Sequence, residues 1–321
     1  MREIIRKKLM IFSGTSHPDL GVEIATGVGE KLGNVEIARF SNGEIYVRFL
    51  ESVRGVDAFV IQTCAEPVND YIMELLLLID ALKRASAKRI TAVVPYYGYS
   101  RQDKKTLARE PISARLLADI ISVAGADRVL SVDLHAGQIQ GFFDFPVDHI
   151  TALPLLASYI AQKNLRDVVV VSPDAGRVKV AKKFADRLCA PMAILHKRRP
   201  EKNVAEVLHV IGEVEGKNAV LIDDMVDTAS TMVNAADALE REGAREIYAC
   251  ATHPILSGPA VERIRDSKIK ELVVTNTLSV PPEKKIDKIS VLSIAPLVAS
   301  TILAVFKEES VSDLFGGDNQ A

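Results

Sequence analysis

The sequence predicts an α/β protein built from two doubly wound domains with parallel sheets, and three observations support this prediction. Short apolar, β-branched runs recur along the 321 residues, amphipathic segments lie between them, and the pattern starts afresh near residue 150. Continuous apolar strands are typical of parallel sheets that are covered on both faces, and their alternation with helices is typical of α/β folds. A chain of this length with 48% hydrophobic residues can form about two domains with large cores.

Seven runs are predicted to form strands of these sheets. They are MIFSG at 10–14, AFVIQ at 58–62, ITAVV at 90–94, VLSVD at 129–133, VVVVS at 168–172, AVLID at 219–223 and ELVVT at 271–275. Residues 70–86 predict a helix between two of these strands, because their apolar side chains recur on one helical face. Gly27, Gly29 and Gly33 miss the spacing of a dinucleotide-binding motif, so we interpret them as helix packing and end signals.

The best domain boundary follows a loop rich in glycine and phenylalanine. We divide the chain there into an N-terminal domain, residues 1–150, and a C-terminal domain, residues 151–321. A last helix is expected over roughly residues 296–308 and is a candidate to pack back on the N-terminal domain. Key strands of both halves end in acidic or imidazole side chains, and open α/β sheets bind ligands beyond their strand carboxyl ends. The sequence therefore predicts a shared cleft.

Composition and charge exclude several classes of function. With 40 basic and 42 acidic residues the net charge is −2, so the chain lacks the positive field of a nucleic-acid-binding protein. The three cysteines, Cys64, Cys189 and Cys250, are far apart, which argues against a disulfide framework or a zinc cluster. The N-terminus has no signal-peptide pattern, and the longest apolar block, residues 72–79, is too short to span a membrane. We expect a cytoplasmic protein without nucleic-acid or membrane partners.

The strongest functional signal is AVLIDDMVDTAST at residues 219–231, in which an apolar strand leads through three acids into a hydroxyl-rich turn. Backbone N–H groups and hydroxyls at a helix N-terminus suit the dianion of a sugar phosphate. Asp223 and Asp224 are placed to accept hydrogen bonds from ribose hydroxyls or to hold a cation. The simpler interpretation is an ordinary N-cap, where Asp, Thr and Ser are common. The paired acids favour a ligand site, because burying two neighbouring carboxylates is costly unless they bind something.

This thirteen-residue pattern resembles that of the phosphoribosyltransferase fold, and DLHAGQIQGFFDFPVD at 133–148 is similar to the signature of the ribose-phosphate pyrophosphokinases. The resemblance extends over nearly the whole chain and implies two domains of the phosphoribosyltransferase type. It implies an enzyme of the phosphate-activated, bacterial-type class. Such an enzyme transfers the β,γ-diphosphate of ATP to the C1 hydroxyl of ribose 5-phosphate, with Mg²⁺, giving phosphoribosyl diphosphate and AMP for nucleotide biosynthesis.

The resemblance also implies roles for residues of each motif. In RFSNGE and PYYGYSRQDKK the implied ATP-binding residues are Phe40, Asn42, Gly43, Glu44, Arg101, Gln102 and Asp103. The implied ribose 5-phosphate-binding residues are Arg199, Asp223, Asp224, Asp227, Thr228, Ala229, Ser230 and Thr231. The implied catalytic residues are Lys197 and Arg199 in HKRRPEKN, a loop that closes over the β-phosphate. The implied metal ligands are His135 and Asp174, with Asp133, Asp144 and Asp148 as further oxygen donors nearby.

Each of these motifs has a simpler interpretation when it is taken alone. Asn42 and Gly43 predict a tight hairpin turn between two strands. A single His135 would be a satisfied core histidine, and the basic runs at 101–105 and 197–199 would be solvated surface. Cationic side chains beside a transferring diphosphate would, however, stabilise the negative charge that builds up on its oxygens.

Two rival functions share part of the pattern. A salvage phosphoribosyltransferase would contain residues 219–231, but it would not need the motifs of the first 150 residues. A catalytically silent regulatory partner of such a synthetase would keep the fold, and the intact catalytic and binding residues argue against it, namely Lys197, Arg199, His135 and Asp224.

Two residues depart from the family pattern. Ser230 stands where glycine is common, and its hydroxyl can still face a phosphate. Arg177 replaces a second glycine near the pyrophosphate loop, which leaves the geometry of that loop open, although a guanidinium is compatible with diphosphate. The resemblance further implies a homohexamer in which ATP sites are shared between subunits.

Overall fold

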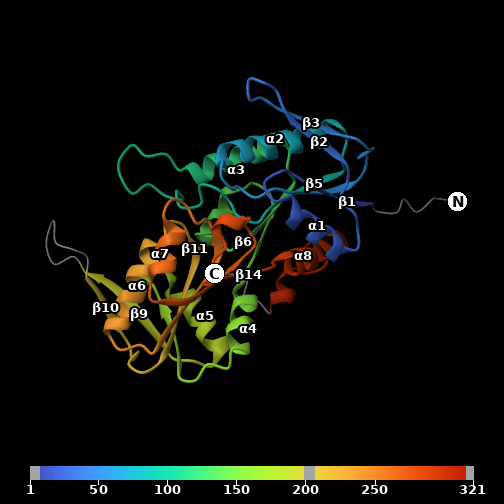
Figure 1. The fold of residues 1–321 in the computed structure, drawn as a ribbon. Coiled ribbons are helices and arrows are strands. Elements are labelled where there is room, and N and C mark those ends of the chain that lie inside the picture. Colours follow the sequence, from blue (N-terminus) through green and yellow to red (C-terminus); the bar gives the residue numbers. More distant parts are fainter. Residues whose placement is uncertain (1–7, 199–206, 316–321) are drawn as a thin grey trace. The chain divides into compact units, whose positions relative to one another are not determined.

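The computed structural model describes residues 8–198 and 207–315, which form two compact units (Figure 1). The first unit contains the described residues up to Thr151, the short segment Thr277–Ser279 and the described residues from Ile294 onward. The second unit contains the described residues between Ala152 and Asn276, together with Val280–Ser293. The chain therefore enters the second unit after Thr151 and returns to the first unit for its last helix.

The first unit is built on a five-stranded parallel sheet. In spatial order its strands are β1 (Leu9–Ser13), β4 (Asp57–Ile61), β5 (Arg89–Val94), β6 (Arg128–Val132) and β7 (Val147–Ile150). Residues of β1, β4, β5 and β6 are almost all buried, as expected for a parallel sheet covered on both faces. Leu32 forms a parallel bridge with Ile11 on the edge of β1 that faces away from β4. The direction of winding thus reverses at β1, and this unit is doubly wound.

Four α-helices belong to the described part of the first unit. They are α1 (Pro18–Val28), α2 (Val68–Arg84), α3 (Ser113–Ala124) and α8 (Ala295–Lys307). Helix α8 lies beside α1, and α2 lies beside α3 (Figure 1). A β-carbon at Gly27 would stand 2.9 Å from Cβ of Ala299, so the missing side chain lets α1 and α8 approach closely. Gly29, with φ 84°, is the C-cap of α1, so the interpretation as helix packing and end signals is confirmed for Gly27 and Gly29. It is wrong for Gly33, which lies beyond the helix and faces the Phe12 ring of β1.

A separate two-stranded hairpin lies between α1 and β4 in the sequence. Its strands are β2 (Val35–Arg39) and β3 (Ile45–Phe49), which pair antiparallel. Gly43 has φ 92° at the turn, and Oδ1 of Asn42 accepts a hydrogen bond from the Glu44 N–H at 3.2 Å, which confirms the predicted turn. An ion pair of 3.0 Å between Arg39 and Asp70 ties the hairpin to α2.

The second unit contains a seven-stranded sheet. In spatial order its strands are β10 (Val207–Ile211), β9 (Met192–Arg198), β8 (Val168–Ser172), β11 (Asn218–Val226), β12 (Glu246–Pro254), β13 (Ile269–Thr275) and β14 (Ile289–Leu292). Only β10 runs antiparallel to its neighbour among these strands. Its helices are α4 (Leu153–Gln162), α5 (Val178–Leu188), α6 (Ser230–Arg241) and α7 (Ala260–Asp266). The strand order reverses between β8 and β11, so this unit is doubly wound as well.

The predicted α/β class with doubly wound parallel sheets is confirmed, and each of the seven predicted runs coincides with a strand. The predicted helices at 70–86 and 296–308 appear as α2 and α8, each displaced by one or two residues. Strand β11 continues three residues beyond its predicted end at Asp223, and β12 was not predicted. Within residues 8–198 and 207–315, every helix is too short or too polar to cross a bilayer.

Candidate active site

Asp223 and Asp224 lie among the last four residues of β11, at the point where the second sheet reverses its strand order. Open α/β sheets bind ligands at such reversal points, beyond the carboxyl ends of the strands. Asp224 is buried, and its backbone N–H donates a hydrogen bond of 2.8 Å to Oδ1 of Asp223. Burial and the neighbouring charge of Asp224 raise the pKa of Asp223 well above its usual range, while the guanidinium of Arg177 opposes this rise. Two carboxylates thus share one largely desolvated site.

The loop after β11 leads into α6 without a side-chain cap. Ala229 occupies the N-cap position with φ 61°, and the helix begins at Ser230. The hydroxyls of Thr228 and Ser230 lie 3.0 Å apart and bond to one another. The structure therefore contradicts the simpler N-cap interpretation of this segment, because no Asp, Thr or Ser side chain caps α6. The N–H groups of the first turn of α6 and these hydroxyls form a surface suited to an anion.

Two residues that the sequence did not single out support this loop from a neighbouring segment. The Ser257 hydroxyl donates a short hydrogen bond to Oδ1 of Asp227, and the Ser257 N–H donates to the Asp227 carbonyl at 3.0 Å. Nη1 of Arg263 donates to the Thr228 carbonyl at 2.9 Å. The Ser-Gly-Pro turn at 257–259 lies just beyond the carboxyl end of β12, the strand beside β11. This Ser-Gly-Pro sequence was the signal from which the contact with the α6 loop could have been predicted. Neighbouring parallel strands bring the loops at their carboxyl ends together.

Two other predicted residues of the second unit, Asp174 and Lys197, belong to the region of β8 and β9. Asp174 follows β8 and starts a 3₁₀ turn, Ala175–Arg177, by accepting hydrogen bonds from the N–H groups of Gly176 and Arg177 at 2.8 and 3.1 Å. Lys197 is the sixth residue of β9, the strand next to β8. Arg199 lies outside the described residues.

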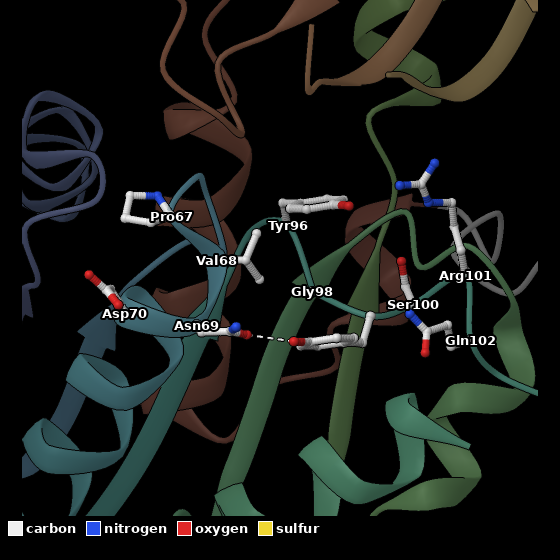
Figure 2. A pocket seen from close by; sticks show the side chains of 10 residues that line it. Pro67, Val68, Asn69, Asp70, Tyr96, Gly98, Ser100, Arg101 and Gln102 are labelled. Atoms are coloured by element: carbon white, nitrogen blue, oxygen red, sulfur yellow. Dashed lines mark hydrogen bonds between the residues drawn. The ribbon is translucent and has the colours of Figure 1, made fainter. Parts of the chain in front are cut away.

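A cavity of about 380 Å³ opens in the first unit beyond the carboxyl ends of β4 and β5 (Figure 2). Its lining consists of Pro67, Val68, Asn69, Asp70, Tyr96, Gly98, Tyr99, Ser100, Arg101 and Gln102. The Tyr99 hydroxyl donates a hydrogen bond of 2.5 Å to Oδ1 of Asn69. A dashed line from the labelled Asn69 marks this bond in Figure 2. Two of the predicted ATP-binding residues, Arg101 and Gln102, therefore line one pocket together with residues that were not predicted.

The side chains next to this cavity are held in place by hydrogen bonds. Oε1 of Gln102 accepts from the Ser113 hydroxyl at 2.6 Å. The carboxylate of Asp103 is buried and accepts from Nε2 of Gln138 at 2.6 Å. The segment is therefore not a simple run of solvated charges, because Asp103 makes a buried contact with the loop after β6.

The hairpin between β2 and β3 carries the other predicted ATP-binding residues. Phe40 is 57% exposed and lies at the end of β2, just before the turn formed by Asn42, Gly43 and Glu44. Its ring packs edge-on against Tyr46, with ring centroids 6.1 Å apart. An exposed aromatic ring at a hairpin turn provides a flat surface on which a purine base can stack.

The Asp-x-His motif follows β6 in the first unit. Asp133 has φ 38°, and its N–H donates to the Ile150 carbonyl at 2.9 Å, while His135 is half-buried two residues further on. Asp148 instead pairs with Arg128 at 2.6 Å near the beginning of strands β7 and β6. The idea that Asp148 donates oxygen near the metal is not supported, because this ion pair lies toward the other end of the strands.

Comparisons with known proteins identify the family. The N-terminal domain of ribose phosphate pyrophosphokinase matches residues 9–125, and the phosphoribosyl synthetase-associated domain matches residues 200–316. A ribose-phosphate pyrophosphokinase of Bacillus subtilis is 57% identical over 309 residues, which cover 96% of this chain and 98% of the relative. One from Corynebacterium ammoniagenes is 55% identical over 313 residues, covering 98% and 99% of the two chains.

A solved structure agrees with these sequence matches. The phosphoribosylpyrophosphate synthetase of Mycobacterium smegmatis has a TM-score of 0.90 and 50% identity, covering 94% of this chain and all of that one. Both domain descriptions, the near-complete coverage and the shared fold point to one conclusion. The chain belongs to the ribose-phosphate pyrophosphokinase family.

Proposed function

We propose that this chain carries out the reaction of its family with one group of side chains in each unit. The chain is a ribose-phosphate diphosphokinase, which transfers the β,γ-diphosphate of ATP to the C1 hydroxyl of ribose 5-phosphate and releases AMP. Residues of the first unit bind ATP. Residues of the second unit bind ribose 5-phosphate and carry the catalytic side chains Lys197 and Arg199.

The observation that carries this proposal is the pair Asp223 and Asp224 beside the uncapped loop of α6. The 5-phosphate dianion is bound by N–H groups and hydroxyls of residues 227–231, and the two carboxylates accept hydrogen bonds from the ribose hydroxyls. Lys197 and Arg199 stabilise the negative charge that develops on the transferring diphosphate. Asp227 keeps the loop in shape through its bonds to Ser257.

The cavity beside β4 and β5 supports the assignment of the ATP-binding residues. The guanidinium of Arg101 suits phosphate oxygens, because its planar donors can bind two of them at once. Gln102 and Asp103 are held by Ser113 and Gln138, so they are available in a fixed arrangement for the nucleotide. The hairpin residues Phe40, Asn42, Gly43 and Glu44 contact the adenine base.

We propose Mg²⁺ as the metal, and His135 in the first unit and Asp174 in the second unit are its candidate protein ligands. Oδ1 of Asp174 already accepts hydrogen bonds from two backbone N–H groups. The other oxygen of this carboxylate, Oδ2, is therefore the candidate ligand atom for the metal. No group of three or more His, Cys, Asp or Glu side chains suited to a metal occurs in residues 8–198 and 207–315. In proteins, Mg²⁺ usually binds through one or two protein ligands plus substrate phosphates and water. When bound, it neutralises phosphate charge during the transfer.

We further propose that the chain assembles as a homohexamer with ATP sites shared between subunits. Helix α3 supports association, since Leu116 (58% exposed), Ile120 and Val123 (80% exposed) follow Ile112 on one face of the helix. Exposed apolar side chains that share a face mark a surface for protein contacts.

Replacing Leu116 and Val123 by Asp should give species lighter than a hexamer in analytical ultracentrifugation. An unchanged mass would contradict the proposal that α3 forms a contact between subunits.

The three cysteines are free thiols in the structure, which fits a reducing compartment, and we propose that the enzyme acts in nucleotide biosynthesis in the cytoplasm.

The decisive experiment follows the reaction of the purified chain by phosphorus NMR, with ATP, ribose 5-phosphate, magnesium and inorganic phosphate. Equal amounts of AMP and phosphoribosyl diphosphate are expected. Lys197→Ala should keep the fold and lose most of the rate, because a cation beside the transferring group is missing. If the wild-type chain forms neither product over a range of phosphate and magnesium concentrations, a silent regulatory partner becomes the better interpretation.

A further inference from the structure

Arg177 is the last residue of the 3₁₀ turn that follows β8, and this turn is held by three hydrogen bonds. Oδ1 of Asp174 accepts from the N–H groups of Gly176 and Arg177, and the Ser172 hydroxyl donates to the Asp174 carbonyl at 2.7 Å. Because β8 and β11 are neighbours, the turn stands beside the end of β11. The backbone of Arg177 is therefore fixed at the reversal point of the sheet.

The side chain of Arg177 contacts both carboxylates of the site. Its Nη2 forms a close ion pair with Oδ2 of Asp224, and its Nε lies 3.4 Å from Oδ1 of Asp223. The Arg177 side chain is 14% exposed, and those of Asp223 and Asp224 are 21% and 5% exposed. The residue that departs from the family pattern thus faces the two acids that the pattern predicts to bind ribose.

This contact has a clear electrostatic consequence. Two adjacent carboxylates in a partly buried site repel one another, and the repulsion is stronger where water is excluded. A guanidinium can serve two carboxylates at once because its donors lie in a planar fork, whereas a lysine ammonium acts as a single point charge. A carboxylate has about four lone-pair sites, so each acid can accept a hydrogen bond from a ligand in addition to its contact with Arg177.

We propose that Arg177 is a positioning residue, which holds Asp223 and Asp224 in one arrangement so that both can accept hydrogen bonds from the hydroxyls of ribose 5-phosphate. The proposal rests on the proposed role of these two acids in binding ribose. The sequence left the geometry around Arg177 open and showed only that a guanidinium is compatible with diphosphate; in the structure the side chain is engaged by the carboxylates. Arg177 therefore acts on sugar affinity through its neighbours.

The test compares Arg177→Met and Arg177→Lys with the wild-type enzyme in steady-state kinetics. Arg177→Met should raise the KM for ribose 5-phosphate by about tenfold or more, since it leaves the buried Asp224 and the partly buried Asp223 without their counter-charge. The KM for ATP should stay within about twofold, and Arg177→Lys should lie between the two enzymes. Lys179→Met removes an exposed positive charge two residues further along and should leave both KM values unchanged.

A second substrate makes the readout specific for the sugar hydroxyls. The wild-type enzyme should prefer ribose 5-phosphate to 2-deoxyribose 5-phosphate, which lacks one hydroxyl, and Arg177→Met should lose most of this preference. An unchanged KM for ribose 5-phosphate would overturn the proposal. So would a change confined to kcat and the KM for ATP, which would indicate contact with the diphosphate instead.

The outcomes also separate this proposal from the proposed function itself. If the wild-type enzyme forms no phosphoribosyl diphosphate, the proposed function fails before Arg177 is tested. If Arg177→Met does not fold, as judged by its thermal transition, Arg177→Lys decides the matter alone. A rise of about threefold or more in its KM for ribose 5-phosphate supports the proposal, and an unchanged value overturns it.

Discussion

Removing the Ser257 hydroxyl tests whether the segment after β12 shapes the phosphate loop. In the structure the hydroxyl donates to the Asp227 carboxylate, while the Ser257 N–H donates to the Asp227 carbonyl and would survive in Ser257→Ala. A hydrogen bond to a charged group is worth about 1.5–3 kcal/mol, and the partial exposure of Ser257 reduces this to about 1–2 kcal/mol. Since about 1.4 kcal/mol corresponds to a factor of ten, the KM for ribose 5-phosphate should rise about 5–30-fold.

The assay is initial-rate AMP formation at saturating ATP with ribose 5-phosphate varied, and the KM for ATP should not change. Ser267→Ala provides the matched control on the same segment. Its hydroxyl donates to the Ile264 carbonyl at 2.8 Å and accepts from the Ile269 N–H at 3.2 Å, away from the loop. The control should lose stability without a change in either KM. If Ser257→Ala shows only a lowered melting temperature and an unchanged KM, Asp227 does not depend on this contact.

Two further predictions concern stability and thiol chemistry. Gly33→Ala should destabilise the first unit by about 1–3 kcal/mol in chemical denaturation, because its β-carbon would stand 2.2 Å from the buried Phe12 ring. Gly29→Ala, at φ 84° in open space, should cost only about 1 kcal/mol, and equal losses would contradict the packing argument. In native protein at pH 8, a thiol reagent should modify Cys189 alone, since burial raises the pKa of Cys64 to about 12 and also raises that of Cys250. Reaction of all three thiols before unfolding would show that the two buried sites open readily.

The sequence predicted the elements that have strong periodicity or specific turn chemistry. Seven apolar runs became strands because β-branched residues between helices suit a covered parallel sheet. The hairpin turn at Asn42 and Gly43 was predictable because it depends on a local property, the positive φ that glycine adopts readily. The carboxylate pair at the end of β11 was also predicted, because both acids and the hydroxyl-rich turn after them belong to one continuous sequence motif.

What the sequence could not predict depends on contacts between distant segments. Strand β12 contains alanine, cysteine, threonine and histidine in place of a β-branched run, although nearly all of it is buried. Missing this strand hid the turn at Ser257, since only a neighbour of β11 can bring that hydroxyl to Asp227. The direction of the Arg177 side chain was undetermined for the same reason, because its partners lie 46 and 47 residues further along the chain.

The first unit shows that a reversal of strand order is not enough to make a phosphate site. The strand order of its sheet reverses at β1, yet the polar groups of the loop after β1 are already hydrogen-bonded to side chains of the same unit. The buried carboxylate of Glu74 accepts from the Thr15 N–H at 2.6 Å and from the Thr15 hydroxyl at 2.7 Å, while Oε1 of Gln62 accepts from Ser16. A carboxylate of this kind satisfies the N–H groups and hydroxyls that an external anion would need.

In the second unit the charges at the reversal point have the opposite arrangement. The acids stand at the end of the strand itself, the loop leading into α6 has no side-chain cap, and an arginine balances the acids. The loop can therefore accept an anion, as the proposed function requires, and the carboxylates that we propose to bind the sugar lie beside it. The same architecture leaves its reversal point open to the proposed ligand in one unit and closes it in the other, because of where each unit places its carboxylates. Glu74, which in the sequence only interrupts an apolar block, is the residue that makes this difference in the first unit.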